Sequence, residues 1–459
     1  MSRGALLQLI AKGEMDKYLY DNNIENTLFK KSFKKITNFA EAHISQYPIS
    51  SSTWGNTITF KIDRYGDLLS NMYLVLKIPQ ISVTDIIGKS ENPRTSEYRV
   101  KWKDYLGNLL IDTIKFKIGG QTIDEQTGEY IQFYTDLYDT TWSKLCMIGH
   151  DESMIIPSTK INEQYLYIPL KFWFCNDIEN ALPIIGLQYH EIEVEIKLKN
   201  WDDLYHVVKK VTNEISISES ETSKFNFEHT TEKLTKKHFD DLRLDCNFIY
   251  LDIEERKIMA EEKLEYLITQ TQYIKTSCKP IDSINLNFNH PVKEIFFVIQ
   301  NKDIFNLGEI FNYSGKSKYL PVNISTITES LWDQIPNKHL LSSASLELNG
   351  VDRVVKKDYK FWHYVQNYEH YRNTVLHNIY MFSFGLSNSF SSGSCNFSRI
   401  NNAELKINLI DNTNEFIHHD DDSKIVSIGP GTNSQISIYA NNYNILVING
   451  GMGGLMFSS

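Results

Sequence analysis

The sequence has few of the residues that build disulfide frameworks, metal sites or membrane spans. Its five cysteines are odd in number, lie far apart and include no CxxC pair, which argues against a disulfide-stapled fold and a Cys/His zinc site. No apolar run approaches the ~18 residues that a membrane-spanning helix needs. The cysteines are expected to be reduced thiols, as in a cytosol-like compartment: Cys146, Cys175, Cys246, Cys278 and Cys395.

Positive charge is also scarce. The chain has 57 acidic and 47 basic residues and a formal net charge of −10. Proteins that bind along a nucleic acid usually carry a stripe of basic side chains that neutralises its phosphates. The nearest candidate is a lysine group interleaved with Phe29 and Phe33, which we interpret as a strand with solvated lysines: Lys30, Lys31, Lys34 and Lys35. No direct binding of nucleic acid is therefore expected.

The first 25 residues are expected to form an N-terminal arm. Their apolar patch, Ala5 to Ala11, is short, is interrupted by Gln8 and is followed by no convincing cleavage site, so a secretory signal is not expected. A short amphipathic arm or helix fits better. Whether it contacts membrane or only protein stays open at this point.

The sequence lacks recognised catalytic motifs such as GxSxG, HExxH and the signature motifs of protein kinases. The run His418 to Asp422 resembles a metal cluster by composition. Adjacent residues on an extended chain point to opposite faces, so a solvated loop is the better interpretation. The glycine-rich segment Gly450 to Gly454 lacks the Lys-Ser/Thr of a phosphate loop, and we interpret it as a tail that needs positive φ angles and close backbone approach.

Two charged segments have structural interpretations as well. Asp63, Arg64, Gly66 and Asp67 are expected to form a turn held by an Arg–carboxylate pair before the next strand. Glu254-Glu255-Arg256 is expected to begin a helix, with its acidic residues near the positive end of the helix dipole. We therefore predict a protein that is not an enzyme, with no catalytic, cofactor-binding or metal-binding residues and no cofactor.

Alternation of apolar and polar residues dominates both halves of the chain. The sequence contains 26 Tyr and 24 Phe, residues that suit pleated, half-buried surfaces. Between His190 and Lys199, four aliphatic residues alternate with charged ones, which predicts a strand with one face in a core and one in water. Similar alternation predicts strands around 114–118, 284–288, 346–348, 405–409 and 436–438, with turns at Gly119-Gly120 and Asn349-Gly350.

Helices are expected at few places: 252–267, 125–145 and 358–371. The polar region from about 200 to 237 is expected to be a loop excursion outside the core. A parallel α/β sheet would need a crossover helix for each strand pair, so an all-β fold is favoured. Because 459 residues are too many for one core, we predict two consecutive antiparallel sandwiches of jelly-roll type with a few short helices.

Several long motifs then identify a resemblance. The first half contains NTLFKKSFKKITNFA at 26–40, DRYGDLLSNMYLVL at 63–76, IGGQTID at 118–124 and YIPLKFWFCNDIENALPIIGLQYHEIEVEIKL at 167–198. The second half contains YLDIEERKIMAEEKLEYLI at 250–268, NFNHPVKEIFFVIQN at 287–301, LNGVDR at 348–353, FSFGLSNSFSSGSCNFSRI at 382–400 and the tail at 443–459. In this order, almost end to end, the chain resembles the major capsid proteins of large nucleocytoplasmic double-stranded DNA viruses.

The resemblance implies a double jelly roll, with eight strands in each roll, and a homotrimer that acts as a pseudo-hexagonal capsomer of an icosahedral shell. The implied division is an N-terminal arm over 1–25 that faces the capsid interior, a first roll over 26–253, a connecting helical segment over 254–263 and a second roll over 264–459. The implied partners are neighbouring capsomers, minor capsid and penton proteins and, through the arm, an inner viral membrane. The protein would be made and assembled in the host cytoplasm and would reside in the virion capsid.

Other functions are compatible with a sandwich fold. One alternative is a minor capsid or scaffold-like paralogue of the same fold. Another is a lectin-like module that binds glycans, for which Trp332 and Trp362 are candidates, although core aromatics are the simpler interpretation. A sandwich-fold hydrolase lacks a carboxylate pair that could be nominated. Three glycosylation sequons, at Asn312, Asn323 and Asn396, are expected to be unmodified.

Overall fold

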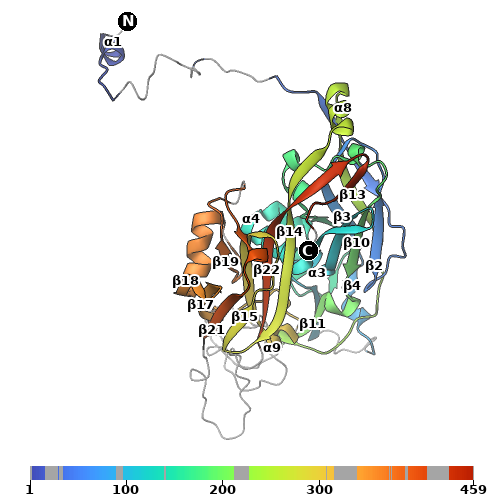
Figure 1. Cartoon of the computed structure of the whole chain (residues 1–459). Helices are drawn as coiled ribbons and strands as arrows, with labels where there is room; N and C mark the ends of the chain where they lie inside the picture. The colour runs from blue at the N-terminus through green and yellow to red at the C-terminus, as the bar shows by residue number, and fades with distance from the viewer. Residues whose placement is uncertain are drawn as a thin grey trace. The chain divides into compact units, whose positions relative to one another are not determined.

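The computed structural model describes residues 3–15, 29, 35–88, 97–138, 141–210, 227–306, 308–314, 339–371, 373, 375–387, 391–410 and 434–457. Residues 1–39 form a separate small unit, and residues 40–459 form the compact body (Figure 1).

The first half of the body is a sandwich of two antiparallel four-stranded sheets. One sheet has the order β1-β13-β3-β9 and the other β2-β10-β6-β7. The strands are β1 (Phe39–Gln46), β2 (Thr57–Ile62), β3 (Leu68–Ile78), β6 (Ile111–Ile118), β7 (Gln121–Thr127), β9 (Gln164–Pro169), β10 (Ile192–Leu198) and β13 (Asp240–Leu251). Smaller sheets at its side pair β12-β11-β5 and β4-β8: β4 (Ile81–Ser82), β5 (Tyr98–Trp102), β8 (Lys160–Ile161), β11 (Tyr205–Lys210) and β12 (Phe227–His229).

The second half repeats this arrangement. Its sheets have the orders β14-β22-β16-β19, with β20 and β23 attached, and β15-β21-β17-β18. The strands are β14 (Leu264–Cys278), β15 (Ile281–Asn285), β16 (Pro291–Asn301), β17 (Leu341–Leu348), β18 (Val351–Asp358), β19 (Tyr380–Ser383), β20 (Cys395–Asn396), β21 (Ala403–Leu409), β22 (Ser434–Asn449) and β23 (Met452–Leu455). In each half the first main strand pairs with the last and the second with the second to last, which is jelly-roll topology. The predicted fold class is confirmed.

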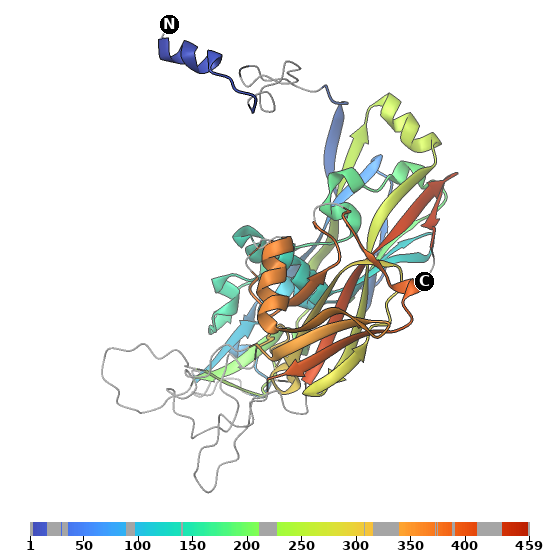
Figure 2. The ribbon, with the colours of Figure 1, turned by 60° about the vertical axis from the view of Figure 1, so that its left-hand side comes forward.

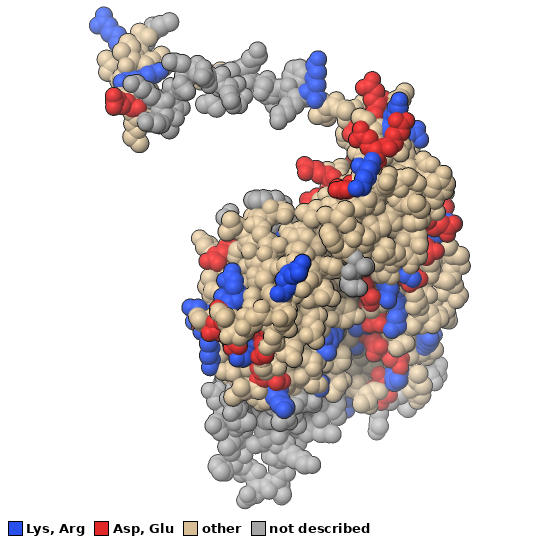
Figure 3. Space-filling model, viewed as in Figure 1, with Lys and Arg blue, Asp and Glu red and all other residues tan. Residues whose placement is uncertain are grey.

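The strand with the clearest alternation shows how sequence sets the packing. Ile192, Val194 and Ile196 of β10 are buried in the first core, and β10 lies between β2 and β6. Outward-facing side chains on and beside this sheet form cross-strand ion pairs: Lys61–Glu191, Lys117–Glu195, Lys115–Glu125 and Lys197–Asp112. Acidic and basic residues are intermingled on the surface of the body in Figure 3. Exposed pairs of this kind add little stability each, so the buried face dominates.

Each sandwich has its own core, and the two long strands of the second one reach both. The second core lies between strands such as β16, β17 and β21. Ile268 of β14 and Leu446 and Ile448 of β22 instead belong to the first core. The two strands lie side by side along the molecule, from α8 to the neighbourhood of β15 (Figure 1). They therefore tie the sandwiches together.

The helices are short and sit mostly between strands. The α-helices are α1 (Arg3–Ile10), α3 (Leu106–Leu110), α4 (Gly128–Tyr138), α5 (Trp142–Met147), α6 (Glu152–Ile155), α7 (Trp173–Asn176), α8 (Ile253–Glu261) and α9 (Lys302–Asn306). The 3₁₀ turns are η1 (Val83–Asp85), η3 (Ile178–Asn180), η4 (Ile184–Gly186), η5 (Trp201–Asp203) and η8 (Phe397–Arg399), and the π-helical turns are η6 (Phe361–Val365) and η7 (Asn367–Tyr371).

The three predicted helical regions are found, with shorter limits. The helix expected over 252–267 ends at Glu261 because β14 begins at Leu264. The region 125–145 begins as strand β7 and becomes helical only at Gly128. The segment 358–371 contains the two π-helical turns η6 and η7.

The prediction of a loop outside the core over 200–237 is wrong for its first part. Trp201, Leu204, Tyr205 and Val208 are buried, and residues 205–210 form β11, which pairs with β5. Polar residues surround this short apolar segment, so composition averaged over the whole region hid it. Residues 211–226 lie outside the described part of the chain.

The N-terminal unit contains α1, whose residues are all exposed. Four large apolar side chains face solvent there: Leu6, Leu7, Leu9 and Ile10. Among the described residues, no helix is both long and apolar enough to span a bilayer.

Candidate functional site: the junction between the sandwiches

Helix α4 belongs to the first sandwich and packs against the second. It follows β7 directly, and an added Cβ at its first residue, Gly128, would lie 2.1 Å from the Asn108 carbonyl oxygen and 2.3 Å from that of Ile111. Only glycine lets the helix begin so close to this backbone. The backbone of α4 lies beside η7 of the second half (Figure 2). The apolar side chains of α4 enter a cluster shared by both sandwiches. Its best-buried members are Phe133, Leu137, Phe296, Ile379, Met381 and Tyr439.

A carboxylate at the start of α4 joins the two halves. Glu129 accepts hydrogen bonds from the hydroxyls of Tyr439 (2.7 Å) and Tyr313 (3.1 Å), and its carboxylate lies 2.6 Å from the Lys275 ammonium. All three partners belong to the second half of the chain. Burial opposes ionisation of Glu129, but Lys275 and the two hydroxyls outweigh it and hold the pKa of Glu129 below its usual value.

The second carboxyl group of the junction belongs to the second sandwich and accepts a hydrogen bond from the first. Glu294 of β16 has no solvent exposure and accepts hydrogen bonds from Tyr138 of α4 (2.6 Å), Tyr371 of η7 (2.6 Å) and Asn441 of β22 (2.8 Å). The rings of Tyr138 and Tyr371 also meet edge to face, with centroids 5.3 Å apart. Burial raises the pKa of the Tyr138 hydroxyl well above its ordinary value, so it stays a donor.

Two aspartates complete the junction. Asp136 of α4 pairs with His377 of the second half. Asp124 of β7 accepts hydrogen bonds from the backbone N–H of Thr271 (2.9 Å) and from Gln126 (2.8 Å). Burial raises the pKa of Asp124 to about 6, because these hydrogen bonds only partly offset its desolvation.

The junction is built to hold a fixed angle between the sandwiches. Four carboxyl groups with several partners each can be satisfied in only one relative placement, and breaking any of them leaves a buried polar group unpaired. The tyrosine hydroxyls here have raised pKa values through burial and act as donors. Within the described part of the chain, no group of three or more His, Cys, Asp or Glu residues could hold a metal ion.

The segments singled out from the sequence have structural positions. Asp67 pairs with Arg256 of α8 at 3.0 Å and accepts a hydrogen bond from the Leu251 N–H. Arg64 instead donates to the His190 carbonyl oxygen, so the prediction that an Arg–carboxylate pair within this turn holds it is wrong. Helix α8 begins as expected, with Asp252 as N-cap.

The glycine tail matches its interpretation. Gly450 and Gly451 have φ angles of +59° and +82° and form the turn between β22 and β23. An added Cβ on Gly453 would lie 2.5 Å from the Leu187 side chain, so the backbone does approach closely there.

The lectin candidates do not form a glycan surface in the described residues. Trp362 is 1% exposed and donates to the Ala344 carbonyl oxygen, as a core residue does. Among the sequons, Asn312 is buried and its amide nitrogen donates to Glu309 at 2.6 Å, whereas Asn396 caps η8. The following lie outside the described residues: Lys30, Lys31, Phe33, Lys34, Asn323, Trp332 and the run 418–422.

Sequence reasoning did not find the junction. Its four carboxyl groups lie in unrelated sequence contexts, and no regular spacing separates them. A usable signal was the run of apolar residues in EIFFVI at 294–299, which is too continuous for a strand with a wet face. A glutamate at the edge of such a run predicts a buried, partnered carboxyl.

Comparison with known proteins adds a consistent result. Residues 27–252 match the family model "Major capsid protein N-terminus", and residues 255–454 match "Large eukaryotic DNA virus major capsid protein". Major capsid proteins of Pyramimonas orientalis virus and Paramecium bursaria Chlorella virus 1 are 29% and 28% identical to this chain, over 99% of it and all of each relative.

Solved structures share the fold. A chain of the "PBCV-1 virus capsid, quasi-atomic model" aligns with a TM-score of 0.70 at 24% identity, over 94% of this chain and all of that one. The Faustovirus major capsid protein aligns with a TM-score of 0.66 at 12% identity, over 97% and 96% of the two chains.

Proposed function

The chain belongs to the major capsid protein family of large eukaryotic DNA viruses, and from this membership we propose that it forms a homotrimeric, pseudo-hexagonal capsomer of an icosahedral shell. Its relatives are structural proteins, and the proposal includes no enzymatic activity.

The observation that carries this proposal is the repeated sandwich within one chain. Both halves have the same strand order, and the junction fixes their relative orientation. Three such chains around a closed threefold axis would present six similar sandwiches, so hexagonal packing needs only a trimer. A flexible junction would let the two halves change their relative orientation and would disturb the hexagonal outline. The buried carboxyl groups would preserve that outline by fixing the orientation.

We also propose the division of labour along the chain. Residues 1–25 would be an arm facing the shell interior, 26–253 and 264–459 the two rolls, and 254–263 their connection. The position of α8 between β13 and β14 supports the connection, and the exposed apolar residues of α1 support a contact of the arm with an inner membrane or a protein.

The protein is a component of the virion capsid. The further partners in the proposal are neighbouring capsomers and minor capsid and penton proteins, with no direct contact to nucleic acid. Trimer contacts would be large and apolar, and contacts between capsomers smaller and more polar, so that assembly can correct errors. Synthesis in the host cytoplasm agrees with the five free cysteines.

Light scattering of the purified protein tests the trimer. The expected mass is about three times the 53.4 kDa of the chain. A stable monomer at micromolar concentration would contradict the proposal. The protein's share of purified particles separates a major from a minor subunit, because the major one should dominate the protein mass.

A further inference from the structure

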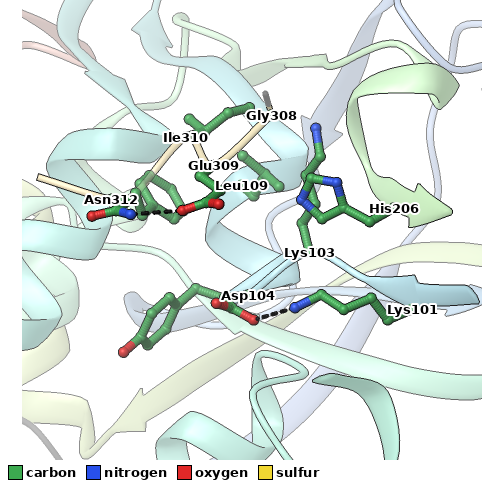
Figure 4. Close-up of a pocket in the computed structure, with 11 residues that line it drawn as sticks. Lys101, Lys103, Asp104, Leu109, His206, Gly308, Glu309, Ile310 and Asn312 are labelled. Carbon is green, nitrogen blue, oxygen red and sulfur yellow. Dashed lines mark hydrogen bonds and ion pairs between the residues drawn. The ribbon is translucent and has the colours of Figure 1, made fainter. Parts of the chain in front are cut away.

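Two adjoining cavities lie between the sandwiches, beside the junction. The smaller has a volume of about 30 Å³ and is drawn in Figure 4. The larger has a volume of about 250 Å³ and is lined by residues of both halves. Leu109, Ile310 and Phe311 line both cavities and separate them.

The smaller cavity contains a buried cation without a carboxylate partner in the described part of the chain. Lys103 is 7% exposed, and its side chain lies next to His206 (Figure 4). Two carboxylates of the cavity wall are engaged elsewhere, since Asp104 pairs with Lys101 at 3.2 Å and Glu309 accepts from Asn312. Asp203 attracts Lys103 but forms no ion pair with it. At about 30 Å³ the cavity has room for roughly two water molecules and no larger ligand.

The larger cavity also contains a lysine without an ion-pair partner, and it has more room for a ligand. Its two carboxylates are occupied, since Glu129 pairs with Lys275 at 2.6 Å and Asp112 with Lys197 at 2.8 Å. None of the described residues forms an ion pair with the third lysine, Lys199, although Asp112, Glu129 and Asp203 attract it from beyond ion-pair distance. Burial lowers the pKa of Lys199, which means that the protein as it stands disfavours this ammonium.

Lys199 is partly buried, and an ammonium withdrawn from water is costly unless an anion accompanies it. The rest of the cavity wall combines apolar side chains, among them Phe311 and Ile436, with the side-chain amides of Gln300 and Gln435. We propose that this cavity binds a small organic anion, a carboxylate or phosphate monoester with a compact apolar body. Its acid group pairs with Lys199, and its apolar body packs against Phe311 and Ile436.

Such a ligand touches both sandwiches at once. Because it binds the folded junction and not the unfolded chain, it raises the stability of the junction by mass action. The site is independent of the capsid proposal, since it needs only the relative placement of the two halves.

Calorimetric titration of the full-length protein with phenyl phosphate and with benzoate tests the site, with benzyl alcohol as the uncharged comparison. We expect saturable binding of at least one of the two anions and none of the alcohol. Lys199→Gln should weaken binding by about tenfold or more, because it removes the charge-assisted contact.

Lys61→Gln is the matched control, since this lysine is exposed, pairs with Glu191 and does not line the cavity. It should change the affinity by less than about twofold, as solvent screens an exposed charge. Absence of saturable binding to the unmodified protein, or equal weakening by both substitutions, would overturn the proposal.

Discussion

The Tyr138 hydroxyl of the first sandwich donates a 2.6 Å hydrogen bond to the carboxyl group of Glu294 in the second, across an interface where that carboxyl has no solvent exposure. Tyr371 and Asn441 donate to the same group. One side chain from the second half thus organises donors from both halves.

Glu294→Ala should therefore destabilise the protein strongly. Three donors would lose their buried acceptor, and we expect a loss of about 3–5 kcal/mol in the free energy of unfolding. Denaturation with guanidinium chloride measures it. Glu265→Ala is the control, because Glu265 pairs with Lys263 at a half-exposed site and should cost less than about 0.5 kcal/mol. Equal effects would show that the junction carries no special share of the stability.

Asp124 should give the protein a pH-dependent stability of unusual sign. Its folded pKa is about 6, against about 3.9 in an unfolded chain. Between these values the folded state holds the proton and the unfolded state releases it, so this group's contribution falls as pH rises from about 4 to about 6. Asp124→Asn should remove that fall, a difference on the order of 2–3 kcal/mol.

The measurement for Asp124 is the free energy of unfolding of both proteins across this pH range. Gln121→Ala, at an exposed site of the same strand without a titratable side chain, serves as the control and should leave the pH slope unchanged. If the free energy of unfolding changed with pH in the same way for wild type and Asp124→Asn, the raised pKa assigned to Asp124 would be contradicted.

Lys103→Met should stabilise the protein at neutral pH. Burial lowers the pKa of Lys103 to about 8, so the folded state bears an unfavourable charge at pH 7. An apolar residue of similar length removes this cost, and the expected gain is about 1–3 kcal/mol. The gain should shrink between about pH 8 and pH 10.5, where the wild-type lysine loses its proton in the fold.

Lys101→Met provides the contrast for Lys103, measured by thermal unfolding at pH 7. Lys101 pairs with Asp104, so its replacement leaves a carboxylate without that partner and should destabilise. Stabilisation by both substitutions, or by neither, would refute the distinction between paired and unpaired lysines.

Gly128→Ala should displace α4 and with it the junction. The added methyl would meet two backbone carbonyl oxygens, which cannot move aside as a side chain can. We expect a loss of several kcal/mol, about 3 or more, in unfolding free energy. Gly120→Ala is the comparison: its φ is +80° but its surroundings are open, so the cost should stay near ~1 kcal/mol. Similar melting temperatures for the two variants would contradict this account.

The sequence predicted those parts of the fold whose signal is local. Alternation located β10 and β21 because each has one face in a core and one in water. It did not locate β16, and it located β22 only around 436–438, because β16 and residues 436–442 of β22 are buried on both faces. The reason is tertiary: the first sandwich covers the outer face of that sheet through α4.

The junction shows the same limit more sharply. Glu129 and Glu294 are 165 residues apart and each is surrounded by unremarkable neighbours in the sequence. Their roles depend on tyrosines contributed by the opposite half, such as Tyr439 and Tyr138. A pattern confined to one segment cannot report such pairs. The lack of a catalytic motif in the sequence gives no hint of where the buried carboxyl groups gather.

The most direct test of the central claim is electron microscopy of the purified protein, viewed along its symmetry axis. The account predicts particles with threefold symmetry and a nearly hexagonal outline, in which each chain contributes two similar lobes. Particles that are monomeric, or that have a twofold axis, would contradict it.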